Sequence, residues 1–190
     1  MLGKRRNSIG SSYLNKSMKL IIDWDFEEQM VDKEINSLSK QLMYGYAANK
    51  KSVKPVNLIF TGWKSKKLTD RLVTHGSQNW VVDIHEQWYI EIFDKESLVY
   101  LTADSENTVD KFEEDKIYIV GGIVDHNRHK NIWFNKAKEQ GISHAKFPIK
   151  ENVNIGDYST VLTVNQVMGN NHHNSYIYRC NTSCQKISGG

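Results

Sequence analysis

Residues 116–122 read KIYIVGG, a near-continuous apolar run that ends in two glycines. The segments LVYLT (98–102), MKLIID (18–23) and VNLIFTG (56–62) have the same character. Short apolar runs without alternating polar residues are typical of parallel strands that are buried on both faces of a sheet. Because segments with helical spacing lie between them, the sequence predicts an α/β fold with a parallel sheet flanked by helices.

The longest predicted helix follows the first strand. Asp25 and Glu28 have the spacing of a capping box, and the helix is expected to end near Asn49. Its apolar face is formed by Val31, Ile35, Leu38 and Leu42. Shorter helices are predicted at 68–76, 86–93 and 131–141, with Gly76 and Gly141 as stops, and strands at 80–85 and 143–149. The acidic segment between 102 and 116 has room for another helix, and 161–168 is expected to be a strand-to-helix junction.

The composition is that of one globular domain. The chain has 190 residues, of which 39% are apolar and 25% are charged, and only two prolines. No apolar stretch approaches the roughly 18 residues that a membrane helix needs. The first residues are basic but no apolar segment follows them, and the two cysteines cannot form a disulfide framework. We therefore expect an intracellular protein that has no contact with a membrane.

The positive charge is concentrated in the first part of the chain. Residues 1–71 contain 14 Lys and Arg against 7 Asp and Glu, whereas residues 72–190 contain 11 against 15. Such asymmetry favours a polyanionic partner, most often nucleic acid. The alternative is a solvated face together with a disordered tail.

The densest group of reactive side chains, DHNRHK, occupies 125–130, just after the strand at 116–122. Gly121 and Gly122 have no Cβ and allow a ligand to approach the backbone, and Asp125 can accept a proton. Ligands of parallel sheets bind at the carboxyl ends of strands, which places the segment 102–105 at the same edge. The alternative is a polar loop that caps the next helix. Asp104 is correspondingly either a helix N-cap or part of a site facing Asp125.

Several common sites are absent from the sequence. It contains no GxGxxG after a strand, no GxxxxGK[ST], no GxSxG and no HExxH, which disfavours classical nucleotide, hydrolase and zincin sites. The histidines and cysteines at 126, 129, 172, 173, 180 and 184 fit no usual zinc spacing, so no metal is predicted.

Four segments together resemble the tRNA guanine-N1-methyltransferases that modify position nine, a family of the SPOUT class. They are LVYLTADSENTVD (98–110), KIYIVGGIVDHNRHK (116–130), AKFPIKENV (145–153) and VLTVNQV (161–167). The strand and helix at 20–51 also match the family pattern. The resemblance implies a SPOUT-type sheet with a C-terminal trefoil knot, S-adenosyl-L-methionine as cofactor and tRNA as partner. It further implies a monomer of the nuclear or cytosolic branch.

The resemblance also assigns residues. Asp125 matches the proposed general base, which takes the proton of guanine N1 as that nitrogen attacks the methyl group. The implied cofactor residues are Leu101, Thr102, Gly121, Gly122, Asp125, His126, Asn127, Arg128, His129, Trp133, Phe147, Val161, Leu162 and Thr163. The candidates for contacts with tRNA phosphates are Lys50, Lys51, Lys64, Lys66, Lys67, Arg71, Arg128 and Lys130.

After Val167 the chain departs from the family pattern and reads MGNNHHNSYIYRCNTSCQKISGG, where relatives continue with an apolar helix that completes the knot. We therefore expect a flexible basic tail at 1–17, a methyltransferase domain at 18–168 with an incomplete knot, and a disordered tail at 169–190. Two classes of function remain: an active methyltransferase, and a non-catalytic tRNA-binding or partner protein that retains the scaffold.

Overall fold

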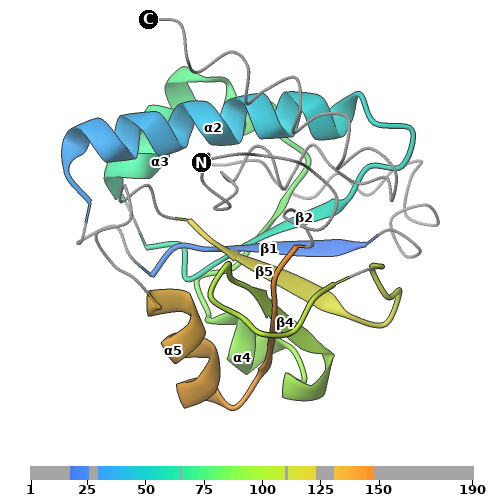
Figure 1. The fold of residues 1–190 in the computed structure, drawn as a ribbon. Helices are drawn as coiled ribbons and strands as arrows, with labels where there is room; N and C mark the ends of the chain where they lie inside the picture. Colours follow the sequence, from blue (N-terminus) through green and yellow to red (C-terminus); the bar gives the residue numbers. More distant parts are fainter. Residues whose placement is uncertain (1–17, 26–29, 65, 110, 123–130, 148–190) are drawn as a thin grey trace, which may run out of the picture.

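The computed structural model describes residues 18–25, 30–64, 66–109, 111–122 and 131–147. Within these residues, six strands form one parallel sheet in the order β3-β2-β1-β5-β4-β6 (Figure 1). The strands are β1 (Lys19–Asp23), β2 (Asn57–Thr61), β3 (Asp83–Ile84), β4 (Leu98–Leu101), β5 (Ile117–Gly121) and β6 (Ser143–Ala145). The predicted parallel α/β architecture is confirmed.

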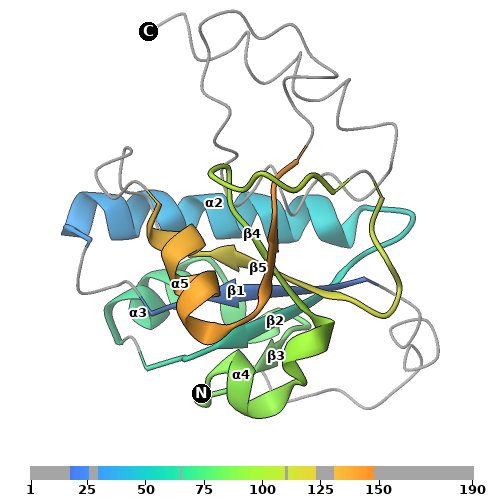
Figure 2. The same cartoon turned by 60° about the horizontal axis from the view of Figure 1, so that its bottom comes forward.

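Helices cover both faces of this sheet (Figure 1 and Figure 2). They are α2 (Asp32–Lys50) and α3 (Lys66–Thr74) on one face, and α4 (Tyr89–Ile92) and α5 (Ile132–Gln140) on the other. Alternate residues of β1 point to opposite faces, so Leu20 and Ile22 pack under α2 and α3, while Ile21 packs under α4 and α5. Burial on both faces explains why the strands lack polar alternation.

The long helix α2 begins at Asp32, one residue after Val31, the first residue of its predicted apolar face. Val31 precedes α2, its backbone N–H donates to Glu34 Oε2 at 2.9 Å, and its side chain is 56% exposed. Ile35, Leu38 and Leu42 are buried as predicted, but the inclusion of Val31 in the apolar face was wrong. Glu28, the second half of the predicted capping box, lies outside the described residues.

Two predicted elements are shorter than expected. The strand at 80–85 is reduced to β3, and the helix at 86–93 to the single turn of α4. Two 3-10 turns, at Ser77–Asn79 and Lys95–Ser97, complete the connections. The helices α3 and α5 confirm the predictions at 68–76 and 131–141, and Gly76 and Gly141 follow them with positive φ.

The acidic segment after β4 forms no helix within residues 103–109 and 111–115, contrary to the expectation. Its backbone bonds to the chain that follows β6, and its internal backbone bonds are limited to isolated turns. Lys146 N–H donates to the Asn107 carbonyl at 2.8 Å, and Val109 N–H donates to the Lys146 carbonyl at 2.9 Å. These bonds extend the sheet locally and use the groups that a helix would need.

Some predictions fall outside the described residues. These are the tails at 1–17 and 169–190, the junction at 161–168, and the segment after Phe147 that would close the knot. None of the helices in the described part of the chain is long and apolar enough to span a membrane.

Candidate functional site

The carboxyl ends of β4, β5 and β6 meet at one edge of the sheet. Leu101 pairs with Val120 of β5 and with Ala145 of β6, and the Thr102 N–H donates to the Ala145 carbonyl at 2.9 Å. Leu101 and Thr102 are buried. Phe147 follows β6 and is half-buried, with its ring edge-to-face to Phe112 at 5.9 Å. The structure therefore brings these predicted cofactor residues together at the edge where parallel sheets bind ligands.

The two glycines at the end of β5 are packed against protein atoms. A Cβ on Gly121 would lie 2.1 Å from the Trp133 ring, and one on Gly122 would lie 2.9 Å from the Asp23 carbonyl oxygen. The Gly122 N–H donates to that carbonyl at 2.8 Å. We expected the glycines to admit a ligand; in this structure they admit an indole ring and the backbone of β1.

Trp133 belongs to the face of the sheet that α4 and α5 cover. Its ring stacks on Tyr100 with centroids 5.6 Å apart and an interplanar angle of 19°. Leu101 and Phe147 pack on the opposite face, with the core under α2 and α3. The predicted cofactor residues are thus divided between the two faces at the same edge.

A buried ionic cluster lies at the end of β1, and the sequence analysis did not single it out. Asp23 has no exposed surface, and Lys136 of α5 donates to its Oδ2 at 2.6 Å. Tyr100 donates to the same oxygen at 2.9 Å, and Lys136 also reaches Asp25 Oδ2 at 2.9 Å. The sequence did contain one sign of this cluster, a carboxylate at the end of an apolar strand. Burial of such a charge costs free energy unless it is paired, so a cationic partner was to be expected.

Burial dominates the titration of this cluster. Desolvation raises the pKa of Asp23, although the ammonium of Lys136 and the hydrogen bonds that Asp23 accepts act in the opposite direction. Desolvation, together with the nearby Asp23, raises the pKa of Tyr100 well above its ordinary value. Tyr100 therefore stays protonated and donates its hydroxyl to Asp23, and the cluster connects α5 to the end of β1.

Asp104 begins no helix, which excludes the N-cap, one of the two alternatives for this residue. Its Oδ2 accepts the backbone N–H of Asn131 at 3.2 Å, and its own N–H donates to Thr102 Oγ1 at 3.4 Å. Asn131 precedes α5 and has φ +60°, a conformation that asparagine tolerates better than most residues. Asp104 therefore connects the end of β4 to the start of α5.

The predicted catalytic residue, the rest of the predicted cofactor residues and two of the predicted tRNA contacts lie outside the described residues. They are Asp125, His126, Asn127, Arg128, His129, Lys130, Val161, Leu162 and Thr163. No group of His, Cys, Asp and Glu side chains in the described ranges is arranged to hold a metal ion.

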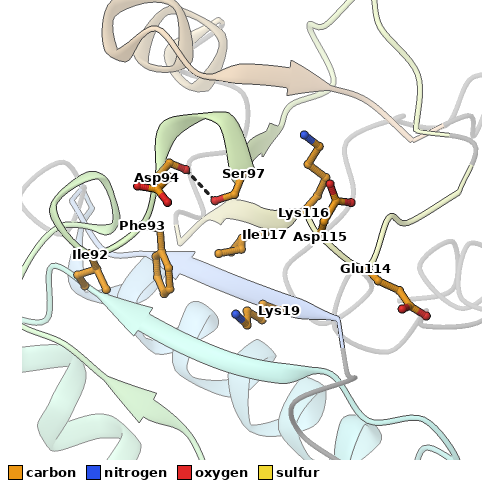
Figure 3. Close-up of a pocket in the computed structure, with 9 residues that line it drawn as sticks. All are labelled: Lys19, Ile92, Phe93, Asp94, Ser97, Glu114, Asp115, Lys116 and Ile117. Atoms are coloured by element: carbon orange, nitrogen blue, oxygen red, sulfur yellow. Dashed lines mark hydrogen bonds between the residues drawn. The ribbon is translucent and has the colours of Figure 1, made fainter.

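A pocket of about 290 Å³ opens at the opposite edge of the sheet (Figure 3). It lies beside the amino ends of β1 and β5, where Lys19 and Ile117 contribute to its wall. Asp94, Glu114, Asp115 and Lys116 give it charges of both signs. Because it is separated from the strand carboxyl ends by the length of the sheet, it is not part of the candidate site.

The comparisons with known proteins identify the family. The family model of tRNA (guanine(9)-N(1))-methyltransferase TRM10/TRM10A matches residues 3–169. The chain belongs to this family. The resemblance drawn from the sequence is confirmed.

Relatives of known sequence and structure agree with this assignment. A tRNA (guanine(9)-N1)-methyltransferase of Schizosaccharomyces pombe is 44% identical over 169 residues, covering 86% of this chain and 55% of that protein. The tRNA methyltransferase 10 homolog A of Rattus norvegicus is 40% identical, covering 87% and 50%. The crystal structure of full-length spTrm10 in complex with SAH is 39% identical, with a TM-score of 0.73 and coverage of 90% and 92%. The chain spans about half the length of the curated relatives it matches.

The described part of the edge fits the family's cofactor. Leu101 and Phe147 are apolar, the Thr102 hydroxyl lies beside them, and Asp104 Oδ2 accepts from that hydroxyl at 3.5 Å. Apolar walls with a few polar groups are typical of small-molecule sites. S-adenosyl-L-methionine is therefore compatible with the residues at the ends of β4 and β6.

Those predicted tRNA contacts of the TRM10-family chain that lie in the described residues fall into two separate groups. Lys64, Lys66 and Lys67 follow the carboxyl end of β2 and are exposed, and Lys67 pairs weakly with Asp32 at 3.5 Å. Arg71 is further along α3. Lys50 and Lys51 lie at the far end of α2, whose 19 residues span roughly 28 Å. The structure does not gather the predicted tRNA contacts into one patch.

The tight contact at Gly121 leads to a stability prediction. We expect Gly121→Ala to lower the free energy of unfolding by about 1–3 kcal/mol, because its methyl group would overlap the Trp133 ring. Urea unfolding of both proteins measures the difference. In a Gly121→Ala/Trp133→Leu double variant the two losses should be less than additive, since the smaller side chain relieves the overlap. Full additivity would contradict the proposed clash.

Proposed function

We propose that this chain transfers a methyl group from S-adenosyl-L-methionine to N1 of guanine at position 9 of tRNA. The observation that carries the proposal is the TRM10/TRM10A match over residues 3–169. The 44% identical relative bears the name of this activity, and the 39% identical spTrm10 was crystallised with SAH. The parallel sheet with a ligand-compatible edge supports the same conclusion.

Guanine N1 carries a proton at neutral pH, so its lone pair becomes a good nucleophile only as the proton leaves. Asp125, three residues after Gly122 in the sequence, is our proposed general base for that proton. The bound cofactor supplies an electrophilic methyl group. Leu101, Thr102 and Phe147 would form part of its wall, and Gly121, Gly122 and Trp133 lie at the same edge of the sheet. The other proposed cofactor residues lie outside the described ranges.

The proposed substrate is tRNA, bound by a monomer in the nucleus or cytoplasm. Exposed lysines beside the carboxyl end of β2 support the binding of tRNA, since they lie at the same edge of the sheet as the candidate site. Contacts of this type position an RNA through its phosphates and carry little sequence information.

Incubation of the purified chain with labelled S-adenosyl-L-methionine and tRNA transcripts that carry G or C at position 9 tests the function directly. We expect label in the G9 transcript as N1-methylguanosine and no label in a transcript whose position 9 is C. Binding of tRNA without methylation would instead favour the non-catalytic tRNA-binding protein. The absence of both tRNA binding and methylation would refute the proposed function.

The lysines after β2 provide a prediction about tRNA affinity. The triple variant Lys64→Glu/Lys66→Glu/Lys67→Glu should raise the tRNA dissociation constant by roughly tenfold or more and flatten the slope of log K against log salt by about 2–3. Binding titrations at several salt concentrations measure both quantities. The matched reversal of Lys54, Lys95 and Lys116, which precede β2, β4 and β5 at the opposite edge of the sheet, is the control. Equal effects of the two triple variants would indicate a general charge effect in place of a defined contact surface.

A further inference from the structure

Trp88 is a partly exposed indole at the candidate-site edge that neither the cofactor nor the proposed catalytic step uses. It directly precedes α4, and its backbone N–H donates to Glu91 Oε2 at 2.8 Å. The ring lies against the residue that follows β2, since a Cβ on Gly62 would be 2.1 Å from Trp88 Cζ3. Trp88 is therefore at the carboxyl end of the strands.

Backbone hydrogen bonds join the two segments that meet at this ring. The Gly62 N–H donates to the Gln87 carbonyl at 3.0 Å, and the Trp63 N–H donates to the His85 carbonyl at 3.2 Å. These bonds join the backbone on both sides of the contact, and Gly62 adopts φ +67°, which suits glycine. A pre-positioned aromatic ring loses little conformational entropy when it binds a partner.

Two ammonium groups lie next to the ring, and they differ in their other partners. Lys136 Nζ is 5.6 Å from the ring centroid but is paired with Asp23 and Asp25. Lys64 Nζ is 5.5 Å from the centroid, its side chain is exposed, and the described residues provide it with no carboxylate partner. Because a cation–π contact at an exposed site is weak, Lys64 can leave the ring for a phosphate.

We propose that Trp88 and Lys64 form a contact site for one unpaired nucleotide of the tRNA, with its base stacked on the indole and an adjacent phosphate bound by the ammonium. Aromatic rings beside basic side chains are the usual means by which proteins hold unpaired nucleotides, because every base has a π-face. Lys66 and Lys67, shortly after Lys64 in the sequence, are also exposed. This inference rests on the proposed function and names a residue that fixes the position of the RNA.

Binding of a tRNA transcript to the full chain tests the site, with Trp88→Leu and Trp88→Phe compared at several salt concentrations. We expect Trp88→Leu to weaken binding at least fivefold without changing the salt slope, and Trp88→Phe to stay within about twofold of the parent. Lys64→Gln should lower the slope by about one. The control is Trp80→Leu, which removes a buried ring stacked on Tyr46 at 4.5 Å before β3.

The outcomes separate this inference from the proposed function. Unchanged binding by Trp88→Leu, in a chain that still binds and methylates tRNA, would overturn the stacking site alone. An equal loss in Trp80→Leu would also overturn it, because the effect would then follow from reduced stability. If the parent chain neither binds nor methylates tRNA, the inference fails together with the proposed function.

Discussion

An Asp125→Asn variant is expected to methylate guanine 9 about 10²–10⁴-fold more slowly than the parent chain in single-turnover reactions. Asparagine has nearly the shape of aspartate but cannot accept the N1 proton. The lone pair of that nitrogen then stays unavailable during the attack on the methyl group. The variant retains the positioning of both substrates, which accounts for the activity that should remain.

Single-turnover rates at saturating tRNA and cofactor measure this effect. Calorimetric titration should show that the variant still binds S-adenosyl-L-methionine, which separates proton transfer from loss of the cofactor. The matched control is Asp115→Asn, an exposed carboxylate beside the pocket at the opposite edge of the sheet, which should leave the rate unchanged. A single-turnover rate in Asp125→Asn equal to that of the parent would eliminate Asp125 as the base.

The second large effect concerns stability. Lys136→Met should lower the free energy of unfolding at pH 7 by about 3–5 kcal/mol, because it leaves the fully buried Asp23 without its cation. Lys136 joins α5 to the end of β1, so the variant also loses a connection next to the candidate site. Chemical denaturation of the two proteins gives the difference.

The loss should depend on pH in a defined direction. Burial raises the pKa of Asp23 above its value in the unfolded chain, so the folded state binds the proton more tightly. As the pH rises above about 4, the buried carboxylate ionises and the free energy of unfolding falls. Removal of the Lys136 ammonium raises this pKa further. The loss in free energy of unfolding of Lys136→Met, relative to the parent chain, therefore grows from acidic to neutral pH. Below the unfolded pKa, Asp23 is protonated in both states and the deficit should be smallest.

A double variant tests whether the charge is the cause. Asp23→Asn/Lys136→Met removes both charges and keeps a group that can accept the Tyr100 hydroxyl, so most of the stability should return. A deficit of Lys136→Met that is the same at pH 4.5 and pH 7.5, or that persists in the double variant, would show that lost packing is responsible instead.

Much of the fold could be predicted from local patterns. The apolar runs at 98–102 and 116–122 became β4 and β5, and Gly141 ended α5 as expected. These features depend on neighbours within a few positions, which periodicity and turn chemistry record. Val31 differed from expectation because a local capping bond to Glu34 places it before the first turn of α2. The segment after β4 differed because a tertiary contact outweighed the local pattern: Asn107 and Val109 bond to Lys146 after β6.

The candidate site was predictable only in part. Leu101, Thr102 and Gly121 were placed correctly at the carboxyl ends of the strands, since parallel strands end at one edge. The role of Gly121 was not predictable, because the ring that fills the space beside it comes from another helix.

The sequence by itself determined the parallel α/β class, the order of strands and helices along the chain, and the family, because these depend on local periodicity and on contiguous motifs. Only the tertiary structure decided which distant side chains meet at the site edge. Asp23 and Lys136 are 113 positions apart, and the indole of Trp88 lies on Gly62. Such pairings follow from strand order, register and helix packing across the sheet, which no local pattern encodes.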